Sequence, residues 1–107
     1  NHVGVARSLR FIWENGHEPI CIKDLVGVAG MSRRGLHKAF LEHLQRTPGQ
    51  ELQRVRIDQA KKLLSKTNQK VETVAHDCGY QSINSFCVAF KRATGMSAKQ
   101  FRDTMRR

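Results

Sequence analysis

The sequence has no apolar run that approaches the roughly 18 residues needed to span a bilayer, and its start lacks a signal-peptide pattern. It has three cysteines, an odd number, and no C-x-x-C pair. Such a set argues against a disulfide framework and a zinc site and suits a reducing cytoplasm. We therefore expect a cytoplasmic protein with no membrane partner, no metal and no cofactor.

Recognisable catalytic spacings are missing as well: paired carboxylates, nucleophile triads and phosphate-binding loops. We therefore expect no enzymatic activity. Acidic residues are also scarce, with 9 Asp and Glu against 19 Lys and Arg among 107 residues, which gives a formal net charge of +10. A single small domain this basic is typically a polyanion binder, with nucleic acid favoured over an anionic membrane surface.

Apolar positions recur with a helical period along the whole chain, and no stretch predicts a strand. Helix stops are expected at Gly16, Gly30, Gly79 and Gly95, and helix caps at Ser32, Thr47, Ser82 and Ser97. The pattern predicts an all-α fold of about seven helices. We expect a first subdomain over about 5–47, a linking helix over about 48–66 and a second subdomain over about 70–107.

The apolar stripes of these helices predict the core. The first helix contributes Val5, Leu9, Ile12 and Trp13; the helix after Ser32 contributes Leu36, Ala39, Phe40 and Leu44; the helix after Ser82 contributes Phe86, Ala89 and Phe90. Cys78 is also expected in the core. Its burial would make it an ordinary structural thiol.

An internal repeat relates the two halves of the chain. An offset of 50 maps Ser32 onto Ser82 and Phe40 onto Phe90, whereas an offset of 49 maps Gly30 onto Gly79. Each repeat therefore has a short helix, a turn with glycine and a longer helix capped by serine, which is the layout of a helix-turn-helix. A plain helical bundle with two similar hairpins is the alternative.

In a helix-turn-helix the second helix enters the major groove with its N-terminal residues against the bases. In the first repeat the outward side chains are Arg33, Arg34, His37 and Lys38, with Glu42 further along the helix. Arginine and lysine can donate to guanine O6 and N7, and His37 is either a contact to a base or phosphate or a solvated surface histidine. Gly35 is explained by a close approach of DNA or of a neighbouring helix.

The second repeat presents a different set. Asn84 can pair with adenine, while Ile83 and Val88 offer methyl groups to a thymine methyl. The residues expected at phosphates are Ser82, Ser85 and Lys91. The alternative for Ile83 and Val88 is packing against a missing domain or partner.

The linking helix would be about 28 Å long at 1.5 Å per residue, against about 34 Å for one turn of duplex DNA. One helix could therefore hold two recognition helices in successive major-groove segments. Basic residues lie along or just past it: Arg54, Arg56, Lys61, Lys62, Lys66 and Lys70. Phosphate contact and plain solvation are both open for these, and Arg54 or Arg56 could instead brace the core through an ion pair.

Three segments resemble the DNA-binding domain of the AraC/XylS family of bacterial transcription regulators: GMSRRGLHKAF, TPGQELQRVRIDQAKKLL and VAHDCGYQSINSFCVAFKRATGMSAKQFR. The resemblance implies two helix-turn-helix subdomains joined by one long helix. It places the base-reading positions at Arg34, His37, Lys38, Ile83, Asn84 and Val88.

The sequence departs from the family pattern at three positions. Arginine is common where Val88 stands, proline where Ala98 stands, and an aromatic residue where Glu51 stands. The Val88 departure removes an expected guanine contact from the second repeat. The Arg33-Arg34 pair is similar to xylose-regulator-like members, whose sensory domain binds a sugar.

The function expected from the residues and the resemblance is sequence-specific binding of double-stranded DNA, as the output domain of a transcription regulator such as an activator. We expect it in the bacterial cytoplasm at the nucleoid, with RNA polymerase as a further partner. The chain begins at Asn1 without methionine, and we expect it to be part of a longer protein. Because its sequence shows no effector pocket, an effector and dimerisation domain is expected before Asn1. The alternative is a helical module that binds nucleic acid without sequence preference.

Overall fold

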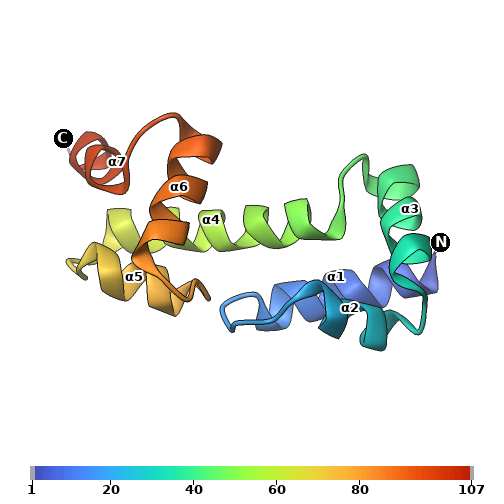
Figure 1. Cartoon of the computed structure of the whole chain (residues 1–107). Helices are drawn as coiled ribbons and strands as arrows, with labels where there is room; N and C mark the ends of the chain where they lie inside the picture. The colour runs from blue at the N-terminus through green and yellow to red at the C-terminus, as the bar shows by residue number, and fades with distance from the viewer. Residues whose placement is uncertain (1, 107) are drawn as a thin grey trace. The chain divides into compact units, whose positions relative to one another are not determined.

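The computed structural model describes residues 2–106, and within them it has seven helices and no strand (Figure 1). The helices are α1 (Val3–Asn15), α2 (Ile22–Ala29), α3 (Arg33–Leu44), α4 (Pro48–Lys66), α5 (Val71–Asp77), α6 (Ile83–Thr94) and α7 (Ala98–Met105). The predicted all-α fold is confirmed.

The helices begin where side chains replace missing backbone hydrogen bonds. The four predicted caps are confirmed, because the hydroxyls of Ser32, Thr47, Ser82 and Ser97 each accept from the backbone N–H three residues on, at 3.0–3.1 Å. At the starts of α4 and α7 the bond is reciprocal, since Gln50 and Gln100 accept from the cap's own backbone N–H at 2.8 and 2.9 Å. These capping boxes fix the starts of α4 and α7.

Three of the four predicted helix-stop glycines have left-handed backbone: Gly30 at φ 67°, Gly79 at 96° and Gly95 at 83°. Gly16 ends α1 differently, with an ordinary φ of −62°. A Cβ on Gly16 would lie 2.6 Å from the carbonyl oxygen of Ile12, so close packing requires the glycine there. Helix α3 ends on a non-glycine residue, Gln45, at φ 56°.

Contacts divide the chain into two compact units, and the division falls inside α4. The first unit ends at Val55 and the second begins at Arg56, but the second also includes the short segment His17–Pro19. Helix α4 therefore gives its N-terminal half to one core and its C-terminal half to the other.

The first unit packs around an apolar cluster from α1, α2, α3 and the start of α4: Val5, Ile12, Leu25, Ala29, Leu36, Ala39, Phe40 and Leu52. One predicted core residue is wrong. Trp13 was assigned to the apolar stripe of α1, but its side chain is 59% exposed. Its indole N–H instead donates to the buried carboxylate of Glu51 at 3.1 Å, and this polar contact holds the ring at the surface.

The second unit has its own cluster: Ile57, Ala60, Leu64, Val74, Ala75, Cys78, Tyr80, Phe86, Phe90 and Ala98. Rings form a continuous chain in it, with centroids 5.4 Å apart for Tyr80–Phe86, 5.6 Å for Phe86–Phe90 and 5.5 Å for Phe90–Phe101. Tilted and edge-to-face pairs at these separations are favourable. The expected burial of Cys78 is confirmed.

Candidate nucleic-acid interface

The first helix-turn-helix consists of α2, the turn Gly30–Ser32 and α3. The left-handed Gly30 closes α2 by donating its N–H to the Val26 carbonyl at 3.1 Å. Two residues later the chain is extended at Ser32, whose hydroxyl accepts from the N–H of Gly35 and starts α3. The glycine and the serine thus produce the sharp change of direction between the helices.

Gly35 has a local explanation. A Cβ added there would lie 3.0 Å from the Ser32 hydroxyl and 3.6 Å from the terminal methyl of Met31. The residue that approaches Gly35 closely in this unit is thus the cap of its own helix. The glycine keeps room for the cap in the first turn of α3.

The exposed face of α3 is cationic. Leu36, Ala39 and Phe40 are buried, and this fixes the rotation of the helix about its axis. The opposite side carries the four predicted residues of this repeat, all exposed: Arg33, Arg34, His37 and Lys38. Within residues 2–106 none of the four has an ion-pair partner. The charges of Arg33, Arg34 and Lys38 are therefore available to an outside anion.

The second helix-turn-helix consists of α5, the turn from Cys78 to Ser82, and α6. Gly79 again provides the left-handed residue, and its N–H donates to the His76 carbonyl at 3.0 Å. Two residues separate this glycine from the cap, against one in the first repeat, so the extra residue that changes the offset from 49 to 50 lies in the turn. One of the two is Tyr80, which is buried against Phe86.

The exposed face of α6 is mainly uncharged. Phe86 and Phe90 are fully buried, whereas Ile83 is 38% and Val88 58% exposed. Asn84 and Cys87 are exposed between them, and Lys91 follows one turn after Cys87. The hydroxyl of Ser82 accepts from the Ser85 backbone N–H and donates to the Ser85 hydroxyl at 3.0 Å, which leaves the hydroxyl proton of Ser85 for an outside acceptor.

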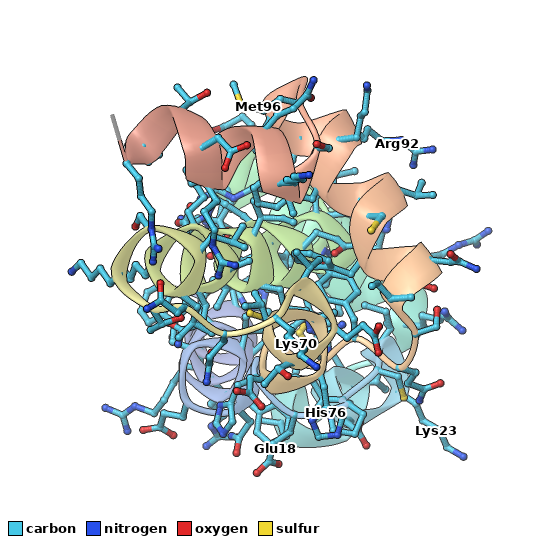
Figure 2. The ribbon with its side chains drawn as sticks, turned by 90° about the vertical axis from the view of Figure 1, so that its left-hand side faces the viewer. Glu18, Lys23, Lys70, His76, Arg92 and Met96 are labelled. Carbon is cyan, nitrogen blue, oxygen red and sulfur yellow. The ribbon has the colours of Figure 1, made fainter. Side chains whose placement is uncertain are left out.

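Further positive charge lies in the last turn of α6 and along α4. Lys91 and Arg92 are exposed in the last turn of α6, and Figure 2 shows Arg92 pointing away from the ribbon. Lys62, Lys66 and Lys70 are exposed along or just past α4. These five side chains are available for phosphate.

Two arginines of α4 are used inside their own units. Arg54 forms a two-point ion pair with buried Glu51, with nitrogen–oxygen distances of 3.0 and 2.7 Å, so the predicted core brace is confirmed for this residue. Arg56 donates to the Glu18 carbonyl at 2.8 Å and lies over the Tyr80 ring, 5.5 Å from its centroid. Both side chains are committed to the fold.

Sequence reasoning missed the cluster around Glu51. Besides Arg54, the carboxylate accepts from Arg46 at 2.6 Å and from the indole of Trp13. Burial by itself raises the pKa of Glu51, but the hydrogen bonds from Arg54, Trp13 and Arg46 and the charge of Arg54 outweigh it. The pKa therefore lies below its ordinary value of 4.5. The signal in the sequence was a glutamate at a position of α4 that points inward.

The cysteines are all free thiols. Burial raises the pKa of Cys78 to about 11, which keeps it protonated, while Cys21 and Cys87 are exposed. In the part of the chain that the structure describes, no group of three or more His, Cys, Asp or Glu could hold a metal ion. No helix between residues 2 and 106 has the length and apolarity to cross a membrane.

Two serine-capped helices, each placed after a left-handed glycine turn and each with an exposed face fixed by buried apolar residues, define a tandem helix-turn-helix protein. Residues 25–104 match the family model of a helix-turn-helix domain, and the chain belongs to this family. More particularly, it is a DNA-binding domain of the AraC/XylS type, as the resemblance of its sequence predicts. This family is defined by a helix-turn-helix domain and not by a catalytic site.

Known proteins similar to this chain include the raffinose operon transcriptional regulatory protein RafR of Pediococcus pentosaceus, 31% identical over 92% of the chain and 35% of RafR. Among solved structures, the DNA-binding domain of the global transcriptional factor AdpA, in complex with a target DNA, is 30% identical with a TM-score of 0.90, over 96% of this chain and 93% of that one. A probable AraC family transcriptional regulator from Rhodopseudomonas palustris is 28% identical with a TM-score of 0.82, over 97% and 98%.

The chain spans about a third of the length of the curated relatives that it matches, with 28%, 35% and 36% covered in three of them.

Proposed function

We propose that this domain binds double-stranded DNA sequence-specifically as the output domain of a bacterial transcription regulator. The observation that carries the proposal is the face of α3, where Arg33, Arg34, His37 and Lys38 are exposed without ion-pair partners at the start of a helix-turn-helix recognition helix. Arginine and lysine at this place can donate to guanine in the major groove. The likeness to a domain bound to its target DNA supports the same reading.

Affinity and choice of sequence come from different side chains. The exposed lysines and Arg92, together with Lys91 and the backbone N–H groups at the starts of α3 and α6, bind phosphate without regard to sequence. Arg34, His37 and Lys38 read bases in one major-groove segment, and α6 occupies a second. The alternative is a module with the same salt dependence and no preferred sequence.

The parent protein supplies the remaining functions. The longer relatives support an effector and dimerisation domain outside this chain, and the raffinose regulator supports a sugar as effector. The parent protein would act as an activator by contacting RNA polymerase at a promoter. It would do so in the cytoplasm, at the nucleoid. The domain itself acts by binding and not by catalysis.

Selection of bound sequences from random duplexes at one fixed salt concentration tests the proposal. We expect a motif of two blocks about 10 bp apart, because two recognition helices would occupy successive groove segments. A single block would mean that the second recognition helix, α6, only holds the DNA backbone. Selection that enriches no motif would contradict sequence-specific binding and support the non-specific module.

A variant of α3 tests the base-reading assignment. Arg34→Ala should weaken binding to the selected duplex by about 1–3 kcal/mol and relax the preference at one base position. The matched control is Arg7→Ala, which removes the same charge from an exposed position of α1. A repeated selection with Arg34→Ala that returns the original motif unchanged would refute this assignment. Lys91→Ala should weaken all duplexes about equally and lower the salt dependence.

A further inference from the structure

We propose that the second recognition helix, α6, recognises the 5-methyl groups of thymine through Ile83 and Val88. Its ligand would be an A·T-containing major-groove segment in which methyl contact replaces hydrogen bonding to guanine. The inference rests on the proposed function, because it names what the second helix-turn-helix reads.

The first argument is where exposed apolar side chains lie. Among residues 2–106 the large exposed apolar side chains are Val3, Trp13, Leu41, Ile83, Val88 and Met105. Two of these six share the exposed side of α6. Under the offset of 50 they take the places of Arg33 and Lys38 on α3. The two recognition helices thus present opposite chemistry at equivalent positions.

The second argument is that this face cannot turn inward. Phe86 and Phe90 on the other side of α6 are fully buried, and the chain of ring contacts continues from them to Tyr80 and Phe101. Rotating Val88 toward the core would expose these rings to water, which costs far more than one valine gains by burial. The apolar face is therefore a fixed feature of the folded unit.

The third argument is charge. Helix α6 has no acidic residue, and Lys91 and Arg92 extend its exposed side with positive charge. An apolar surface next to cations suits a polyanion with an apolar group better than it suits an apolar protein surface. Thymine C5-methyl is the apolar group on the edges of the bases in the major groove.

Asn84 completes the same assignment. It lies four residues before Val88, so the two side chains are neighbours on one helix face. Its amide can accept from N6 and donate to N7 of adenine. The combination of one adenine reader and two methyl contacts is complementary to A·T pairs.

Replacement of thymine by deoxyuridine tests the proposal, because it removes the methyl group and leaves the hydrogen-bonding groups in place. Each thymine of the selected duplex is replaced in turn, and the Kd is measured by fluorescence anisotropy at fixed salt. A buried methyl group contributes about 0.8 kcal/mol, so we expect a loss of about three- to fivefold at one or two thymines of one block. Thymines in the block read by α3 serve as internal controls.

Variants of Val88 connect the effect to this side chain. Val88 is largely exposed, so Val88→Ala should fold, and with this variant the deoxyuridine at the contacted position should cause no further loss. Val88→Thr is the matched control, because it keeps one methyl group and should retain part of the effect. Val88→Arg should move the preference at that position toward guanine.

The outcomes separate the inference from the function on which it rests. A two-block motif whose thymines all tolerate deoxyuridine, with Val88→Ala binding as wild type does, would overturn methyl recognition and leave sequence-specific binding intact. A one-block motif would do the same. If Val88→Ala instead changed the self-association of the full-length protein and left DNA binding alone, the face would be a protein contact. A failure to select any motif would contradict both methyl recognition and sequence-specific binding.

Discussion

The two helix-turn-helix units have the same backbone plan and different chemistry. Each has a left-handed glycine at the turn, a serine cap and a fully buried phenylalanine at equivalent positions, Phe40 and Phe90. The first unit holds its helices with mostly aliphatic side chains and a buried carboxylate, and its recognition helix is cationic. The second uses a chain of aromatic rings, and the exposed face of its recognition helix is mainly uncharged.

This difference shows which positions the architecture restricts. The turn needs a left-handed residue, and the start of the next helix needs an acceptor for its backbone N–H groups. Glycine and serine therefore recur at these places in both repeats. The core needs volume and apolar surface but accepts different sets of side chains. The exposed positions outside the cap, such as Arg34 on α3 and Val88 on α6, do not belong to either core, and this leaves them free to specialise.

The largest expected effect is the loss of stability when a buried phenylalanine is removed from either core. Phe40→Ala and Phe90→Ala should each lower the free energy of unfolding by about 3–5 kcal/mol, because both remove a fully buried ring. Phe90 has two ring partners, whereas within residues 2–106 Phe40 has no ring contact. Each aromatic pair adds about 0.5–1.5 kcal/mol, so Phe90→Ala should cost more.

Urea unfolding can measure this comparison with one optical probe in each unit. Trp13 is the sole tryptophan and lies in the first unit, and Tyr80 is the sole tyrosine and lies in the second. Val88→Ala serves as the control for truncation at an exposed position. Equal losses for the two phenylalanine variants would show that the ring chain adds nothing beyond burial.

The next effect concerns Glu51, the buried carboxylate of the first unit. Glu51→Gln should lower the free energy of unfolding at pH 7 by about 1–3 kcal/mol, because hydrogen bonds between charged groups are lost. Both arginine partners are partly in solvent, and this limits the size of the loss. Glu14→Gln on the exposed side of α1 is the matched control.

The pH dependence of that difference gives an independent check. The pKa of Glu51 is lower in the folded unit than its ordinary value of 4.5, so the folded state binds fewer protons than the unfolded state there. The stabilisation is therefore present above about pH 4.5 and is lost as the pH falls through the folded pKa. We expect the gap between wild type and Glu51→Gln, followed by circular dichroism in urea, to shrink below pH 4.5. A gap that stayed constant would assign the loss to packing.

The smallest effects come from two glycines of the first unit. A Cβ on Gly27 or on Gly30 would meet nothing within 4 Å, and the two differ in backbone conformation. Gly27→Ala, inside α2, should raise the free energy of unfolding by about 0.5–1 kcal/mol. Gly30→Ala, at φ 67°, should lower it by about 1–2 kcal/mol. Thermal unfolding of both variants would check the opposite signs; a shift in the same direction would contradict this account.

The repeat explains why this pair is informative. The turn glycine recurs as Gly79 in the second unit, whereas the place of Gly27 is taken by His76 at the offset of 49. The positive φ at the turn requires glycine, and glycine is present there in both repeats. The position of Gly27 has no such requirement, and the second repeat has a different residue there.

The sequence predicted helix ends better than side-chain partners. The start of α4 at Pro48 and its end at Lys66 agree with the prediction, because a capping box and the loss of apolar periodicity are local signals. Trp13 was misplaced because its apolar ring fits the stripe of α1, and nothing nearby in the sequence indicates a hydrogen bond to a residue 38 positions away. The base and phosphate contacts assigned to α3 and α6 remain predictions.

The sequence by itself determined the helices and the two repeated turns, because periodicity and capping depend on residues that are close in the chain. Its composition determined the positive charge, and the resemblance of three segments indicated the family. The tertiary structure decided which charges are committed and which are available. It buried Glu51, turned Arg54 and Arg56 toward partners in their own units, and left Arg33, Arg34 and Lys38 exposed. The physical reason is that a buried charge needs an ion-pair or hydrogen-bond partner. Such partners come from distant parts of the chain, which meet only in the folded unit.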